Sequence, residues 1–284
     1  MIRRAQPWLG TLVEISIVDL MQEDTAKNMS NTAAAINAAF AAVAMVHRRM
    51  SFHAADSDVA AINRLPVGDS IAVDAHTATV LRCAMLIEQA SAGAFNIACG
   101  STLAAWGHLP GPVVPAGFAA PLATPLPRGA ITVTGEQVTK NDPAWIDLGG
   151  IAKGYAVDLA VDVLVAAGIA AGCVNAGGDL RVFGAVDFPV AIRNPQAPTR
   201  IGQTLQLREQ ALATSACYFS RRVDTGVVTS ALVDGSNGSP VTNERSASVR
   251  APTCMLADAL TKLVIAGGAS HPLLARFSAT AFLI

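Results

Sequence analysis

The segment Ile146-Asp-Leu-Gly-Gly-Ile-Ala-Lys-Gly-Tyr155 is the most informative stretch of the sequence. Its pattern predicts a short strand over residues 145–148, which ends in two glycines and turns directly into a helix over 153–167. Glycines let a backbone approach a ligand closely, and a helix N-terminus offers unpaired N–H groups and a positive dipole end. With Lys153 in the first turn, the segment is suited to bind a phosphate or diphosphate. It has neither Walker A nor Gly-x-Gly-x-x-Gly spacing, and a tight turn with a solvated lysine explains it equally well.

The composition around this segment is that of a protein with a large core. Of the 284 residues, 52% are hydrophobic and only 14% are charged, which argues against disorder. The formal net charge is −1 and no basic run is longer than two residues, so we expect no nucleic-acid partner. The five cysteines stand far apart, which argues against a disulfide framework or a zinc site.

The hydropathy of the chain does not by itself indicate a membrane protein. The most apolar long stretch, residues 32–46, is shorter than the roughly 20 apolar residues of a spanning helix. We therefore expect a buried helix here and no membrane span. The N-terminus shows no apolar signal core and no lipobox cysteine, which predicts a cytoplasmic protein, or a periplasmic one if a leader was trimmed.

Strands and helices follow one another without regular alternation, which favours an α+β fold over a doubly wound sheet. The expected helices are 25–46, 56–64, 75–92, 153–167 and a last one that begins near residue 256. The loop 109–128 contains six of the fifteen prolines and is the candidate boundary between two subdomains.

Two further segments carry polar groups beside glycines or at a helix start. Val174-Asn-Ala-Gly-Gly-Asp-Leu-Arg181 is, by itself, an ordinary glycine hairpin with an ion pair. Ala257-Asp-Ala-Leu-Thr-Lys262 places Asp258 at the start of a helix, where an acidic residue is usually a dipole partner and less often a metal ligand.

Taken together, in this order and spacing, the three segments resemble the ApbE family of FAD:protein FMN transferases, formerly called thiamine biosynthesis lipoproteins. Four shorter segments extend the resemblance over nearly the whole chain. These are Leu9-Gly10-Thr11, Met50-Ser51, Gly93-Ala-Phe-Asn96 and Ala213-Thr-Ser215. The resemblance implies one α+β domain over residues 3–275, a mixed sheet-and-helix fold with two intertwined subdomains.

The resemblance also implies a reaction and a set of site residues. The family binds FAD with Mg²⁺ at the diphosphate, transfers FMN to a threonine or serine of an acceptor flavoprotein, and releases AMP. Lys153 and Asp258 would be the catalytic residues. The FAD-binding residues would be Leu9, His53, Ala94, Phe95, Asn96, Asp147, Lys153 and Leu232. The magnesium ligands would be the Gly150 carbonyl, Asp258 and Thr261.

The chain departs from the family pattern at the expected general base. The family has a histidine in a His-x-x-Asp-Pro stretch, where this chain has Ala231, and Gly235 replaces the proline. A methyl group cannot accept a proton, so His53 and His108 are the candidate substitutes. Asn96 replaces the aspartate of the family.

The second departure concerns the metal. The family has a threonine ligand four residues after the aspartate, where this chain has Lys262, and Thr261 lies about 100° round the helix. An ammonium has no acceptor and cannot ligate Mg²⁺. We therefore predict that Lys262 stands in the place of the metal and pairs with Asp258 or the diphosphate. In the alternative, Lys262 points to solvent and Thr261 shifts to serve as the ligand.

Three functions agree with these residues. The favoured one is an active FMN transferase, because the FAD-binding segments are retained. The second is an FAD-binding protein that has lost turnover, and the third is a hydrolase that splits FAD into FMN and AMP.

Overall fold

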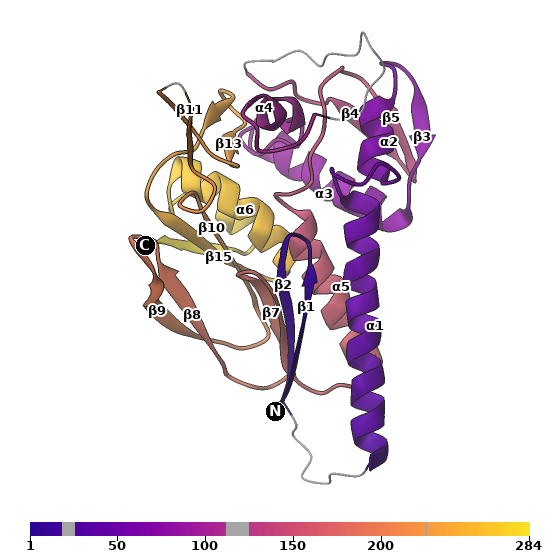
Figure 1. Ribbon diagram of the computed structural model, residues 1–284, viewed down its shortest axis with the longest axis vertical. Coiled ribbons are helices and arrows are strands. Elements are labelled where there is room, and N and C mark those ends of the chain that lie inside the picture. The colour runs from indigo at the N-terminus through magenta and orange to yellow at the C-terminus, as the bar shows by residue number, and fades with distance from the viewer. Residues whose placement is uncertain (19–25, 112–124, 225) are drawn as a thin grey trace.

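The computed structural model describes residues 1–18, 26–111, 125–224 and 226–284. Its centre is a seven-stranded antiparallel sheet with strand order β1-β2-β6-β7-β10-β15-β16 (Figure 1). The strands are β1 (Ile2–Trp8), β2 (Thr11–Ile17), β6 (Gly172–Ala176), β7 (Asp179–Phe183), β10 (Ala211–Ala216), β15 (Ser246–Ala251) and β16 (Thr280–Leu283).

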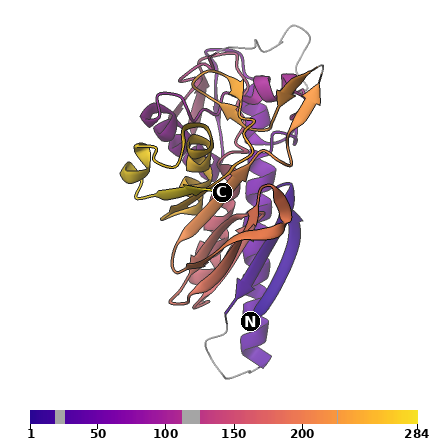
Figure 2. The same ribbon diagram turned by 90° about the vertical axis from the view of Figure 1, so that its left-hand side faces the viewer.

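Alternate residues of the central strands enter two different cores, because successive side chains of a strand point to opposite faces. Val174 of β6 and Ala213 of β10 lie in the larger core, together with the helices. Their neighbours Cys173 and Leu212 lie in a second core beneath a hairpin of β8 (Phe188–Asn194) and β9 (Ala197–Leu207). This hairpin faces the viewer in Figure 2. The central strands β6, β7 and β10 are therefore buried on both faces.

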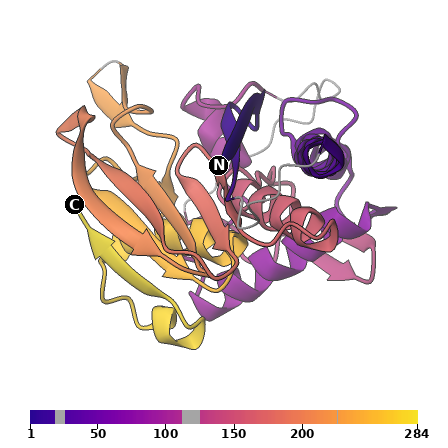
Figure 3. The ribbon, with the colours of Figure 1, turned by 90° about the horizontal axis from the view of Figure 1, so that it is seen from below.

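Three helices cover the other face of the sheet. α5 (Ala152–Ala166) packs on β6 and β7, and α6 (Cys254–Gly267) packs on β10 and β15. The long helix α1 (Ala26–Met50) packs along α5, as Figure 3 shows from below. By length and composition alone, its part Met29–Met50 is able to cross a membrane. That is weak evidence, because a core helix of a soluble protein passes the same test, and the expectation of no membrane span stays a prediction.

A smaller layer lies above these helices in Figure 1. Its elements are α2 (Asp58–Arg64), α3 (Ala75–Ala90), α4 (Gly100–Ala105) and a three-stranded sheet of β3 (Ser70–Ala72), β5 (Gln137–Lys140) and β4 (Ile131–Thr134). The remaining elements are the hairpins β11 (Arg222–Asp224) with β12 (Val227–Thr229) and β13 (Val233–Asp234) with β14 (Ser239–Pro240), and the short helix α7 (Leu273–Arg276). The α+β class is thus confirmed.

The expected strand over 145–148 is wrong. Ile146 pairs with the side chain of Asn63, which donates to its carbonyl at 3.0 Å and accepts from its N–H at 2.7 Å. The Asp147 N–H donates to the Ile97 carbonyl. The segment is extended, but one buried side chain satisfies the polar groups that a neighbouring strand would otherwise pair.

The last long helix begins two residues earlier than the sequence predicts. α6 begins at Cys254, because the Thr253 hydroxyl caps it by accepting from the Leu256 N–H at 3.3 Å. Asp258 therefore lies in the second turn. The expected boundary in 109–128 falls mainly on 112–124, which lie outside the described residues, and it stays a prediction.

Candidate active site

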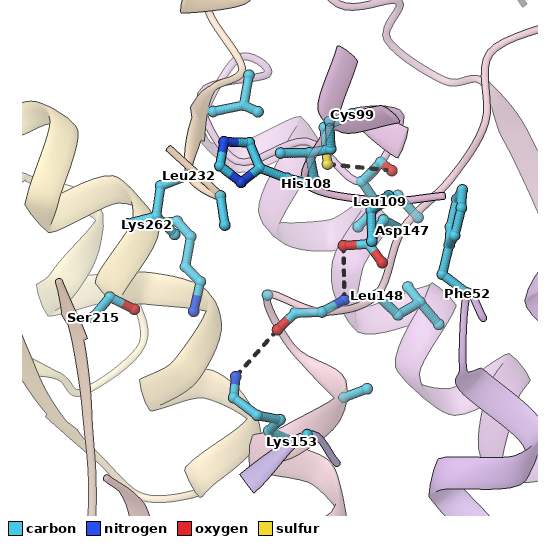
Figure 4. A pocket seen from close by; sticks show the side chains of 18 of the residues that line it. Phe52, Cys99, His108, Leu109, Asp147, Leu148, Lys153, Ser215, Leu232 and Lys262 are labelled. Atoms are coloured by element: carbon cyan, nitrogen blue, oxygen red, sulfur yellow. Dashed lines mark hydrogen bonds between the residues drawn. The ribbon is translucent and has the colours of Figure 1, made fainter. Parts of the chain in front are cut away.

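A cavity of about 520 Å³ lies where the N-terminus of α5 meets α6 and the smaller layer (Figure 4). The predicted FAD-binding residues all line it, although they come from segments far apart in the sequence. They are Leu9, His53, Ala94, Phe95, Asn96, Asp147, Lys153 and Leu232, and Gly150 joins them. Asp258 and Thr261 are fully buried and do not line it. Sequence reasoning missed Phe52 and Cys99 in the wall, because an apolar residue carries no motif.

The turn before α5 forms the floor of the cavity. The N–H groups of Ile151 and Ala152 both donate to the Leu148 carbonyl, at 3.0 and 2.9 Å, which closes the turn around the two glycines. The Gly149 N–H donates to the Asp147 carboxylate at 3.0 Å. Burial raises the pKa of Asp147, and this N–H and Lys153 partly offset the rise.

Lys153 joins the three sequence segments. Its ammonium lies 3.0 Å from Asp179 Oδ2 at the start of β7 and 3.4 Å from Asp258 Oδ2 in α6, and it donates to the Gly149 carbonyl at 3.1 Å. Burial by itself lowers the pKa of Lys153, but the two carboxylates outweigh it and raise the pKa above its usual range. The ion pair predicted within the β6–β7 hairpin is not among the contacts of the described residues. Asp179 pairs with Lys153, and Arg181 pairs with Asp158 of α5.

Asp258 is hydrogen-bonded to the first turn of α5. Its Oδ2 accepts from the Gly154 N–H at 3.1 Å, and a Cβ at position 154 would lie 2.2 Å from the Cys254 carbonyl oxygen. Burial by itself raises the pKa of Asp258, but Lys153 and Lys262 outweigh it and lower the pKa. Asp258 is thus a dipole partner, as an acidic residue near a helix start usually is, but of the neighbouring helix α5.

Lys262 turns toward Asp258 and does not point to solvent. Its ammonium donates to the Asp258 carbonyl at 2.9 Å, to Asp258 Oδ1, and to Thr261 Oγ1 at 3.1 Å. Its side chain is 13% exposed. The prediction that Lys262 pairs with Asp258 is therefore confirmed, and the solvent-facing alternative is wrong.

The two side chains predicted to hold Mg²⁺, Asp258 and Thr261, do not fit that ion. One Asp258 oxygen pairs with Lys262, and the other accepts from Gly154 and Lys153. The Thr261 hydroxyl donates to the Asp258 carbonyl at 2.6 Å, so its lone pairs accept from Ser215 and Lys262. No group of three or more His, Cys, Asp or Glu residues in the described ranges could hold a metal ion.

The departures at Asn96 and Gly235 are consistent with local packing. Asn96 donates its amide to the Pro127 carbonyl at 3.0 Å and accepts from the Ala98 N–H at 2.8 Å. The Gly235 N–H donates to the Ala94 carbonyl at 3.1 Å, and a Cβ there would lie 2.2 Å from the Gly93 oxygen. An aspartate could not make the Asn96 donation, and a proline could not make the Gly235 donation.

Three histidines, His47, His53 and His108, line the cavity, and His108 lies near the position of the missing base. Ala231 is exposed, and its N–H donates to the Ser220 hydroxyl at 3.3 Å. His108 Nε2 lies 3.1 Å from Thr229 Oγ1, two residues before Ala231 in the chain. Burial, and then the charge of Arg222, lower the pKa of His108. His53 is exposed on the cavity wall.

Leu9 enters the cavity wall from a strained turn. It forms, with Gly10, the two-residue connection between β1 and β2, and both have positive φ, 56° and 71°. That geometry is typical of a type I′ hairpin. A bulky residue in this region is rare, and such strain is commonly found at ligand sites.

Comparisons with known proteins agree with this arrangement. An FAD:protein FMN transferase of Vibrio cholerae is 30% identical over 241 residues, which cover 78% of this chain and 70% of that protein. One of Rhodobacter capsulatus is 33% identical over 221 residues, covering 74% of this chain and 42% of that protein.

Solved structures extend the likeness to the fold. The crystal structure of the ApbE protein of Thermotoga maritima superimposes with a TM-score of 0.82 at 25% identity, over 100% of this chain and 94% of that one. The flavin transferase ApbE of Vibrio cholerae gives 0.79 at 26% identity, over 100% and 93%. The model of the ApbE family matches residues 9–281, and the chain therefore belongs to the ApbE family.

Proposed function

We propose that this chain is an FAD:protein FMN transferase, which moves FMN from FAD to a threonine or serine of an acceptor flavoprotein and releases AMP. The observation that carries the proposal is the meeting of the three segments at Lys153, on the floor of a cavity and at a helix N-terminus. The names of the similar transferases support it.

The two ends of FAD call for different surroundings, and the cavity offers both. Leu9, Phe95 and Leu232 form apolar wall suited to the flavin ring. The ammonium groups of Lys153 and Lys262 and the N-terminus of α5 offer positively charged donors to a diphosphate, although the two lysines are themselves paired with carboxylates. Asp258 acts as a positioning residue, because it fixes both lysines without lining the cavity itself.

The transfer exchanges one phosphorus–oxygen bond for another. The acceptor hydroxyl attacks the FMN phosphorus, and the bond from this phosphorus to the bridging oxygen breaks. The electron pair leaves with AMP, and the hydroxyl proton passes to a base. We assign the base to His108, because it lies beside the position of the missing histidine and its lowered pKa keeps it neutral near pH 7. The transfer needs no metal in this proposal, because the side chains of Asp258 and Thr261 are already engaged with donors of the chain.

The test is incubation of the full chain with FAD and a threonine-bearing acceptor peptide, with AMP release and flavin attachment followed by chromatography. We expect AMP and flavinylated peptide in equal amounts from the wild type and neither from Lys153→Met. Arg276→Met removes an exposed cation on α7, away from the cavity, and serves as the matched control. AMP with free FMN and unmodified peptide would indicate a hydrolase instead. Intact bound FAD would indicate a binding protein.

A further inference from the structure

The ammonium of Lys262 lies in a cage of oxygens supplied by its own helix. The Asp258 carbonyl, the Asp258 carboxylate and the Thr261 hydroxyl all accept from it. Three oxygen ligands around one small cation resemble the surroundings of a bound metal ion, but the cation is covalently part of the chain. A tethered cation occupies such a place at high effective concentration and repels a second cation from it.

The position of this cation relative to the cavity is fixed by packing. A Cβ on Gly150 would lie 3.2 Å from Lys262 Cε, so the lysine stem lies directly against the glycine turn. Lys262 lines the cavity, and Figure 4 shows its amine and that of Lys153 pointing toward the turn after Leu148. Both ammonium groups therefore face the place proposed for the diphosphate.

The charges of the cluster show what Lys262 contributes. Lys153 and Lys262 are balanced by Asp179 and Asp258, so the four groups sum to zero. With a threonine at 262 the same cluster would carry −1 and would repel a diphosphate unless a cation were bound there. The Lys262 ammonium supplies the positive charge that a bound cation would otherwise have to provide.

We propose that Lys262 is a built-in replacement for the divalent cation, so that this protein binds the FAD diphosphate and transfers FMN independently of magnesium. The inference rests on the proposed function. The contact from Lys262 to Thr261 is the longest of its three, and Thr261 keeps Ser215 and the Asp258 carbonyl as partners. That donor is therefore the one that turns to a phosphate oxygen when FAD binds.

The test measures the Kd of FAD by titration calorimetry on the full chain, in EDTA and through a titration with MgCl₂. For the wild type we expect the same Kd in both conditions. Lys262→Met should weaken binding about tenfold, as for the loss of one hydrogen bond to a charged group, with no recovery in magnesium. Lys262→Thr should bind weakly in EDTA and recover with magnesium. Arg276→Met should behave as the wild type.

The outcomes distinguish the role proposed for Lys262 from the proposed transferase activity. Wild-type FAD binding that requires magnesium, or Lys262→Met binding as tightly as the wild type, would overturn the role of Lys262 and leave the transferase proposal standing. Magnesium-independent FAD binding without AMP release would support the role proposed for Lys262 and overturn the proposal that the chain is a transferase. If FAD does not bind at all, both are wrong. Should the Lys262 variants fail to fold by circular dichroism, the wild-type titration alone decides.

Discussion

At the residue scale, several positions where the family has a characteristic side chain carry a different residue here, and neighbouring groups accommodate it. Asn96 is the clearest case, because it uses its amide both to donate to Pro127 and to accept from Ala98. His108 is the second case. It contacts Thr229 at the end of β12, two residues before Ala231, and so lies near the position where the family has its histidine.

We predict that Asn96→Asp, which restores the family residue, destabilises the protein by about 1–3 kcal/mol. The carboxylate cannot donate to the Pro127 carbonyl and leaves it without this partner. Urea unfolding monitored by circular dichroism measures the change. Asn141→Asp is a control at an exposed position, where water replaces the lost donors. Equal stability of Asn96→Asp and wild type would contradict the prediction.

His108→Ala should lower the rate of AMP release about 10²–10⁴-fold while the Kd of FAD stays unchanged, because the base touches only the acceptor hydroxyl. His47→Ala is the matched control, since His47 also lines the cavity but is neither a predicted FAD-binding residue nor a candidate base. Single-turnover assays separate the two constants. A larger loss of rate for His53→Ala would move the base to that residue.

The pH profile of the same assay should carry the signature of His108. The neutral imidazole is the active form, so the rate rises with pH through its pKa. Because burial and Arg222 lower that pKa, the acid limb should lie below pH 6.5. Arg222→Gln removes the charge and should move the limb to higher pH. An acid limb that is unchanged in this variant would exclude His108 as the titrating group.

At the element scale, α5 and α6 cap each other. Asp258 of α6 accepts from the Gly154 N–H near the start of α5. Asp158 of α5 accepts from the N–H groups of Cys254 and Met255 at the start of α6, at 2.9 and 2.8 Å. This exchange satisfies donors that a helix start leaves unpaired, and it brings both lysines to the carboxylate of Asp258.

The exchange depends on the close approach that Gly154 allows. We predict that Gly154→Ala destabilises the protein by about 3 kcal/mol, because its Cβ would lie 2.2 Å from a backbone carbonyl oxygen. Urea unfolding provides the measurement. Gly267→Ala, at the exposed end of α6, should change stability by less than about 1 kcal/mol. Similar values for the two variants would show that the helices can separate at little cost.

At the scale of the whole molecule, the cavity joins the covered sheet to the smaller layer, so a ligand there links both parts. We predict that FAD raises the melting temperature, with a gain of about 2.7 kcal/mol at a hundredfold excess over Kd. Lys153→Met should remove the shift, and Arg276→Met should keep it. Differential scanning calorimetry provides the measurement, and a shift that survives in Lys153→Met would place the nucleotide elsewhere.

The sequence by itself predicted the main helices and a set of residues that the fold brings to one cavity. Periodicity predicted α3 and α5 to within two residues, since short-range patterns encode helices. The order of the glycine segments indicated the family, and the residues named for FAD all line one cavity. The lysine at 262 already argued against a metal ligand there, because its chemistry is independent of the fold.

Only the tertiary structure decided which groups meet. Lys153 pairs with Asp179 and Asp258, which lie on β7 and α6, and no local pattern specifies a contact across that separation. The extended segment at Ile146 was misread as a strand because its partner is a side chain on a distant helix. The direction of Lys262 was likewise open in the sequence. Packing against Gly150 and the carboxylate of Asp258 settles it, since a half-buried ammonium that leaves water needs a partner of opposite charge and Asp258 supplies it.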